Sequence, residues 1–418
     1  MMKGYICAVD IGSAKISACV AGIKQRRITE IFVERMPSKG LRRGSVVDAT
    51  SLIACVEKIL KKLKTKSGIP IKSVYLNISG EDIVTKHSKA ILPLAERGNK
   101  VITLSDIQKV REQARILGSS LEEEIIHQIP FKYAIDAKSN ILQPLGLYSH
   151  KLEVDLYLIC AKIASFQNLM RVINQSGYDV KKIFFSGIAT SRAVFTLQSL
   201  KDGINLLCDI GNDITELVLF NEGLLEGVEI IQTGGSKLNE ELAKSLDIPL
   251  ELAEEVKKSC AIPADINSID EEKEILIKKD NIYKPIKQKV VAEMLKAKAK
   301  EISQEIKAKV ETYIPVTHIK RFVVTGNTVL LDGLLELLEE ALGIRVELGR
   351  INNQEIAHLL NQEVAASGQK SLDYLTCLGM LAAVMNGEES LVVPASKPSG
   401  NFFVNTLERA KEVYQEYF

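Results

Sequence analysis

Two short segments of this 418-residue chain carry the same residues at the same spacing, Asp10–Gly12 and Asp209–Gly211. In each, an aspartate ends an apolar run and a glycine follows two positions later. Such a glycine lets backbone N–H groups approach a phosphate and form an anion-binding nest. An aspartate beside it can hold a hydrated Mg²⁺ through water, so Asp10 and Asp209 are candidates for positioning magnesium and water. One such loop is typical of an ordinary hairpin, whereas two predict a shared phosphate site.

The segments around the two loops repeat as well, which predicts how they are positioned. Three short strands are expected around each loop: Tyr5–Asp10, Ile16–Ile23 and Ile28–Arg35, then Asn205–Asp209, Ile214–Phe220 and Gly227–Gln232. The interval between the two copies of this pattern is too long for a solenoid repeat. The duplication therefore predicts two related domains that face each other across a cleft.

Helical periodicity between these strands indicates an α/β protein. The predicted helices are Ser51–Lys64, Asp106–Leu117, Phe166–Gln175, Val290–Glu311 and Leu334–Leu342, the last stopped by Gly343 and followed by a strand, Arg345–Leu348. We interpret the many charges of the long helix at 290–311 as a solvated face. Two more turns, Thr233–Gly235 and the one after Arg321–Thr325, lie where a strand meets a helix.

Composition argues against several classes of function. The formal net charge is +1, and tryptophan is absent, so neither a basic nucleic-acid surface nor a stacking platform is expected. The seven cysteines form no CxxC pair and the five histidines are scattered, which indicates buried thiols and no zinc site. No secretory signal or long apolar run is present, so we expect a cytoplasmic protein whose membrane contact is peripheral.

Longer segments resemble a known family. The two phosphate loops resemble those of the actin, Hsp70 and hexokinase superfamily. Residues 124–136 (EIIHQIPFKYAID) and 142–159 (LQPLGLYSHKLEVDLYLI) resemble the inserted subdomain, called 1C, that is peculiar to the FtsA family of bacterial cell-division proteins. Shorter matches are RRGSVVD at 42–48, GGSKLNEELA at 234–243 and AEEVK at 253–257. The resemblance extends from about residue 4 to residue 388.

The resemblance implies an actin-like duplicated ATPase fold, with two domains around a nucleotide cleft and an FtsA-type 1C insert. The implied parts are 1–83 and 163–196 (subdomain 1A), 84–162 (1C), 197–226 (first part of 2A), 227–310 (2B), 311–390 (second part of 2A and return to 1A), 391–400 (linker) and 401–418 (amphipathic helix). It also implies ATP and Mg²⁺ in the cleft, filament formation, and binding of the tubulin-like FtsZ through 2B. Membrane lipids and other division proteins are the further implied partners, with no nucleic acid.

The same resemblance distributes the nucleotide-binding residues over the cleft. The phosphate candidates are Gly12, Ser13, Ala14, Lys15, Gly211, Asn212, Asp213 and Thr215. The candidates for contacts around the nucleoside are Gly234, Gly235, Lys237, Asn239, Glu254, Lys257, Gly326 and Asn327.

Two departures from the family pattern predict weak ATP binding and at most slow hydrolysis. The second loop of the family usually reads Asp-Ile-Gly-Gly-Gly-Thr-Thr-Asp, whereas this chain has Asn212 and Asp213 after Gly211. Two like charges about 4 Å apart near a surface cost on the order of 4 kcal/mol unless a cation screens them. The adenosine loop, usually three glycines, reads Gly326-Asn327-Thr328. A nucleotide-weakened paralogue is one interpretation.

The last 18 residues resume a helical pattern after a linker of Pro, Ser and Gly. The membrane-binding candidates on one face are Phe402, Phe403, Leu407, Tyr414, Tyr417 and Phe418. The helix lacks the basic face that favours anionic lipids. A helix docked on its own domain and a frayed terminus are the competing interpretations.

Three other functions remain open at this point. A sugar-kinase-type phosphotransferase would need a base at a substrate cleft, and none is evident. An Hsp70-like chaperone would need a substrate domain, but only a linker and one helix follow the ATPase part. An actin-like adaptor of another membrane machine, such as the pilus-assembly protein PilM, is the strongest alternative.

Overall fold

The computed structural model describes residues 4–25, 27–95, 98–136, 138–263, 266, 269–279, 282–367 and 370–387. The predicted linker 391–400 and amphipathic helix 401–418 lie outside these residues. Two five-stranded sheets dominate the described part, in the orders β13-β6-β1-β2-β3 and β16-β15-β14-β19-β20. The two orders correspond strand for strand, so the duplication expected from the sequence is present in the topology.

The first sheet contains β1 (Gly4–Ile11), β2 (Lys15–Lys24), β3 (Arg27–Pro37), β6 (Ser73–Ile78) and β13 (Asp179–Phe185). The second contains β14 (Ile204–Ile210), β15 (Thr215–Asn221), β16 (Leu224–Ile231), β19 (Ile319–Thr325) and β20 (Val346–Leu348). The predicted strands are confirmed, with ends that differ by at most three residues. In register, Asp10 lies opposite Ser17 and Asp209 lies opposite Glu216.

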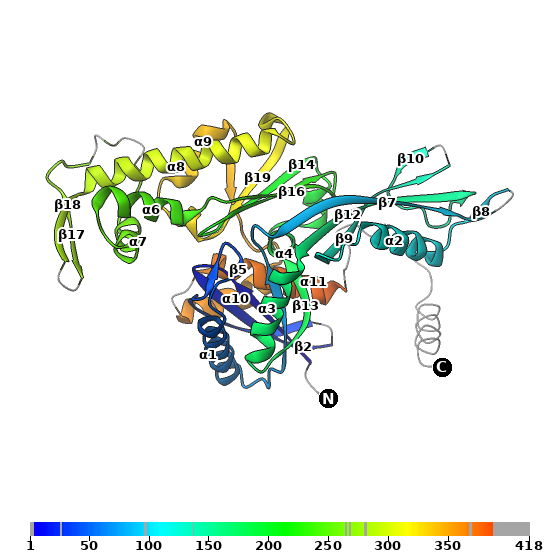
Figure 1. Cartoon of the computed structure of the whole chain (residues 1–418), viewed down its shortest axis with the longest axis horizontal. Helices are drawn as coiled ribbons and strands as arrows, with labels where there is room; N and C mark the ends of the chain where they lie inside the picture. The colour runs from blue at the N-terminus through cyan, green and yellow to red at the C-terminus, as the bar shows by residue number, and fades with distance from the viewer. Residues whose placement is uncertain are drawn as a thin grey trace.

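Helices cover both sheets and join them. On the first sheet lie α1 (Ala49–Ser67) and α3 (Ile163–Gln175), whose apolar faces share a core with β1, β2 and β6. Between the two halves, α4 (Ser186–Val194) packs against α11 (Leu375–Asn386), and Figure 1 shows this pair at the junction. The largest core cluster contains residues of both sheets and both helices, so the two halves form one packed body.

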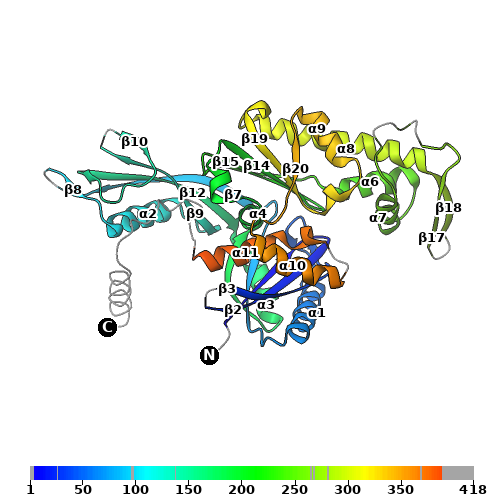
Figure 2. The ribbon, with the colours of Figure 1, turned by 180° about the vertical axis from the view of Figure 1, so that it is seen from behind.

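An inserted unit projects from the junction of the halves, as Figures 1 and 2 show. Its four-stranded sheet has the order β10-β9-β12-β7. Its elements are β7 (Ile83–Pro93), β8 (Lys100–Val101), α2 (Leu104–Gly118), β9 (Glu123–Ile135), β10 (Lys138–Ile141), β11 (Tyr148–Ser149) and β12 (Lys151–Lys162). The unit has a core of its own, in which Val110 and Ala114 of α2 are buried with Leu152 and Leu156 of β12.

At the other end of the molecule the second half carries the predicted long helix, α8 (Gln288–Glu311). It buries Val291, Leu295, Ile302 and Ile306 along one side, and its charged residues are mostly accessible, as predicted. Around it lie α6 (Gly235–Leu246), α7 (Leu250–Ser259), α9 (Leu334–Leu342) and the hairpin β17 (Glu274–Lys279) and β18 (Ile282–Lys287). Gly343 follows α9 with φ 71°, as predicted.

The remaining elements are short or connect the halves. They are β4 (Leu41–Arg42), β5 (Ser45–Val46), α5 (Leu197–Leu200), η2 (Val316–His318), η3 (Asn327–Leu330), α10 (Gln354–Ser367) and η4 (Ser371–Tyr374). All seven cysteines are free and buried, which confirms the prediction of buried thiols. Among the described helices, none combines the length and the hydropathy that crossing a bilayer would require.

Candidate functional site

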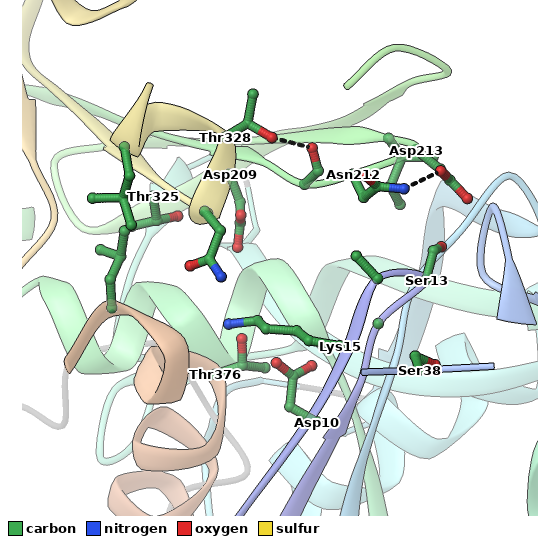
Figure 3. Close-up of a pocket in the computed structure, with 18 of the residues that line it drawn as sticks. Asp10, Ser13, Lys15, Ser38, Asp209, Asn212, Asp213, Thr325, Thr328 and Thr376 are labelled. Carbon is green, nitrogen blue, oxygen red and sulfur yellow. Dashed lines mark hydrogen bonds between the residues drawn. The ribbon is translucent and has the colours of Figure 1, made fainter. Parts of the chain in front are cut away.

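The two Asp-x-Gly loops open into the same cavity, between the two halves of the molecule (Figure 3). Its volume is about 970 Å³. Fourteen of the predicted site residues line it: Asp10, Gly12, Ser13, Ala14, Lys15, Asp209, Gly211, Asn212, Asp213, Asn239, Glu254, Lys257, Gly326 and Asn327. Residues far apart in sequence are thus brought together by the packing of the two halves.

The two loops have the same backbone geometry. The amide of Gly12 donates to the carbonyl of Lys15 at 2.9 Å, and the amide of Gly211 donates to the carbonyl of Ile214 at 2.9 Å. A Cβ at Gly12 would lie 3.1 Å from the Lys15 oxygen, and one at Gly211 would lie 2.9 Å from the Ile214 oxygen. A side chain at either position would thus crowd the carbonyl that closes the hairpin.

Asp10 and Asp209 face each other across the cavity, with Lys15 extending between them (Figure 3). Burial raises the pKa of Asp10 to about 6; Lys15 opposes this rise and the charge of Asp209 adds to it. Burial also raises the pKa of Asp209, against the effects of Lys15 and Thr325. A cation bound between them would stabilise the charged carboxylates, which is the environment that Mg²⁺ and its waters supply.

Lys15, the cation of the first loop, already has an anionic partner. Its Nζ donates to Asp373 Oδ1 at 3.1 Å and to the Asp373 carbonyl at 3.0 Å. Arg35 and Asn327 donate to the same carboxylate. Asp373 belongs to η4, which precedes α11.

The second loop is also engaged across the cleft. Asp213 Oδ2 accepts the backbone amide of Arg43 at 3.0 Å, and its Oδ1 accepts the side chain of Asn212 at 2.7 Å. Since Arg43 belongs to the first half, the carboxylate that departs from the family pattern links the two halves.

Four predicted residues do not line the cavity, namely Thr215, Gly234, Gly235 and Lys237. Thr215 is buried in β15 and donates to the Thr233 carbonyl at 2.7 Å. Gly234 and Gly235 pack against the second loop, where a Cβ at Gly234 would lie 2.6 Å from the Asn212 oxygen. Lys237 pairs with Glu240 on α6. The start of α6 contacts the second loop through its backbone, since the amides of Gly235 and Ser236 donate to the carbonyls of Gly211 and Asn212.

The opposite end of the cavity suits a nucleoside. Leu238, Leu330 and Leu331 provide apolar surface, and Asn239 and Lys257 provide polar groups. Asn239 is 7% exposed, and no hydrogen-bond partner is present for its Oδ1 among the described residues. Lys257 Nζ donates to the Gly235 carbonyl at 3.2 Å, and burial lowers the pKa of this lysine to about 8. An orphaned amide oxygen beside apolar walls fits a base or ribose with hydrogen-bond donors.

Sequence reasoning missed several residues of the cavity, among them Arg35, Ser38, Glu216 and Thr376. Glu216 accepts a hydrogen bond from Ser79, and burial together with the charge of Asp209 raises its pKa well above the ordinary value. The strand pairing that sets Glu216 opposite Asp209 could have revealed it. No sequence signal pointed to Asp373, which is distant from Lys15 in the chain.

The fold is found in other solved structures. A chain in the "PilM-PilN type IV pilus biogenesis complex" is 17% identical, with a TM-score of 0.61, over 93% of this chain and 99% of that one. The ethanolamine utilization protein EutJ from Carboxydothermus hydrogenoformans is 15% identical, with a TM-score of 0.52, over 91% and 90%. Two matched sheets around a shared cleft place the chain among proteins with the actin-like ATPase fold.

Sequence comparison narrows this class to one family. The model "Cell division protein FtsA" matches residues 206–369, and the model "SHS2 domain inserted in FTSA" matches residues 80–160. FtsA of Pseudomonas aeruginosa is 25% identical over 82% of each chain. FtsA of Buchnera aphidicola is 25% identical over 98% of this chain and 97% of its own. The chain belongs to the FtsA family of cell-division proteins, and the projecting unit is its characteristic insert.

Proposed function

We propose that this protein is an actin-like adaptor of bacterial cell division that binds ATP weakly in its cleft. In this proposal it polymerises on the inner face of the cell membrane and holds an FtsZ-like tubulin homologue there, together with other division proteins. The observation that carries the nucleotide part is the pair of matched Asp-x-Gly hairpins on one cavity. The adaptor part is supported by membership in the FtsA family.

The residues of the cavity support binding more than turnover. The backbone amides of both loops and Lys15 would hold phosphates, and Asn239 and Lys257 would hold the nucleoside. Mg²⁺ would neutralise phosphate charge and be held through water by Asp10 and Asp209. Burial of Glu216 favours its neutral form, which cannot accept a proton from an attacking water. We therefore propose at most a slow ATPase.

Calorimetric titration with Mg-ATP tests the nucleotide part. We expect weak heat with a dissociation constant above the micromolar range, because the second loop presents Asp213 in place of glycine. Sub-micromolar affinity for the unmodified chain would contradict this weakness, and no binding under any condition would contradict a nucleotide site.

A bacterial two-hybrid assay against FtsZ and against pilus-assembly components tests the adaptor part. Similarity to the pilus protein in overall shape favours the alternative of a pilus-type adaptor, although at 17% identity it shows only the fold. We expect a signal with FtsZ that is lost when subdomain 2B, at about 227–310, is altered. A signal with pilus components alone would replace the division role by the pilus role.

Membrane attachment rests on the sequence of residues 401–418. Liposome co-sedimentation should pellet the full chain but neither a 1–393 truncation nor a Phe403→Glu/Leu407→Glu double variant. Burying each large apolar side chain contributes roughly 1.5–3 kcal/mol at most. Single molecules should thus bind weakly and filaments more strongly. Equal pelleting of truncated and full chains would favour a docked tail.

A further inference from the structure

The carboxylate of Asp373 occupies the position where the first phosphate loop offers its positive charge. Its side chain has no solvent exposure. Lys15 Nζ lies 3.1 Å from Oδ1, Arg35 Nη1 donates to Oδ2, and Asn327 Nδ2 donates to Oδ1 at 2.7 Å. Three side chains thus donate hydrogen bonds to this carboxylate. Proteins use similar sets of donors to bind anionic ligands.

The carboxylate of Asp373 favours its charged form. Burial by itself would raise the pKa of Asp373, but the charge of Lys15 and the hydrogen bond from Asn327 together hold the pKa below its ordinary value. A buried charge of this kind is stable only while its partners stay in place. Asp373 therefore holds both Lys15 and Arg35.

The contacts of Asp373 also join the two halves of the cleft. Lys15 and Arg35 belong to β2 and β3 of the first sheet, whereas Asn327 belongs to η3, directly after β19 of the second sheet. Two further cations of the cavity also have partners, since Lys257 donates to the Gly235 carbonyl and Lys258 pairs with Glu254. A phosphate beside Lys15 would therefore compete with Asp373 for the charge of this lysine.

We propose that Asp373 is a built-in competitor for the phosphates of the nucleotide, and that ligand binding exchanges its contacts with Lys15 and Arg35 for contacts with phosphate oxygens. This inference rests on the proposed nucleotide site and adds a second cause of weak binding, independent of Asp213.

The variant Asp373→Asn keeps the size of the side chain and removes its charge. We expect it to bind Mg-ATP and Mg-ADP about 10-fold more tightly than the unmodified chain, equivalent to about 1.4 kcal/mol. Adenosine, which carries no phosphate, should show no gain. The matched control is Asp332→Asn, because Asp332 lines the same cavity and forms no ion pair with Lys15 or Arg35 in the described structure.

Unchanged or weaker Mg-ATP binding by Asp373→Asn, while the unmodified chain binds, would overturn the competitor role and leave the nucleotide site intact. An equal gain for adenosine would also overturn it. If the unmodified chain, Asp373→Asn and Asp213→Gly all fail to bind any nucleotide, the proposed nucleotide function fails and the competitor role fails with it.

Hydrogen exchange on the unmodified chain provides a measurement that does not depend on folding of the variant. Saturating Mg-ATP should protect amides of the two loops and make exchange faster in η4, at Ser371–Tyr374, because Asp373 is released. Greater protection of η4 in the presence of Mg-ATP would show that Asp373 stays bound to Lys15, and would overturn the proposal.

Discussion

The two Asp-x-Gly hairpins have the same backbone hydrogen bonds but side chains of different charge. The β1–β2 and β14–β15 loops close with equivalent hydrogen bonds and lie at equivalent places in sheets of the same strand order. The first loop ends in Ala14 and Lys15, whereas the second places Asp213 at the position that corresponds to Ala14. The two loops therefore share a backbone geometry set by strand pairing but differ in their side chains, and Asp213 of the second loop contacts Arg43 of the other half.

The largest expected effect concerns Gly326, which supports the second loop and follows β19. Its φ is 88°, and a Cβ there would lie 2.2 Å from the Ile210 oxygen. Gly326→Ala should lower the free energy of unfolding by about 3 kcal/mol or more, from backbone strain and overpacking together. Gly343→Ala is the control, because Gly343 has φ 71° and no atom within 4 Å of the added Cβ. Equal losses in urea unfolding would show that contact with the second loop is unimportant.

The next effect concerns the carboxylate of the first loop. Because the pKa of Asp10 is raised to about 6, the folded protein binds the proton more tightly than the unfolded chain, whose pKa is about 3.9. Stability should thus fall as pH rises from about 4 to about 6 and stay level above that. Asp10→Asn should remove this fall and raise the free energy of unfolding at pH 7 by about 1–3 kcal/mol.

Urea unfolding of both proteins at several pH values measures this difference. The same substitution should abolish Mg-ATP binding if, as proposed, Asp10 holds magnesium-bound water through both carboxylate oxygens. A variant that is less stable than the unmodified chain at pH 7 would show that Asp10 is not destabilised by burial.

A smaller effect tests the difference between the two loops directly. Asp213→Gly should tighten Mg-ATP binding about 10-fold, or about 1.4 kcal/mol, because a carboxylate is removed from beside the phosphates. The mirror substitution Ala14→Asp should weaken binding by a similar factor. Calorimetric titration of both variants with Mg-ATP measures these affinities. An unchanged affinity for Asp213→Gly would reject the Asp213 carboxylate as a cause of weak binding.

The smallest expected effect concerns a feature that only the second half supplies. Asn239→Ala should reduce affinity for Mg-ATP about 5-fold, because one neutral hydrogen bond contributes about 1 kcal/mol. Stability without ligand should change little, since Asn239 Oδ1 makes no hydrogen bond within the described residues. A large loss of stability would instead show that Asn239 has a structural role.

Local patterns predicted much of the fold. Strands and helices such as β1, β14, α1 and α8 follow from apolar periodicity, and Gly343 ends α9 as its type suggests. The positions of Gly234 and Gly235 did not follow, because a glycine needed for close packing of two loops has the same sequence pattern as one that approaches a ligand.

Spacing within a few residues is enough to predict the two Asp-x-Gly loops and the three strands around each of them, and the recurrence of that pattern indicates the duplication. Tertiary structure alone decided which side chains share the cavity. Asp373 contacts Lys15 although the two residues are 358 positions apart in the chain. Strand pairing places the buried Glu216 opposite Asp209. Electrostatic interactions depend on distance in space and on burial, and neither is encoded in the local order of residues.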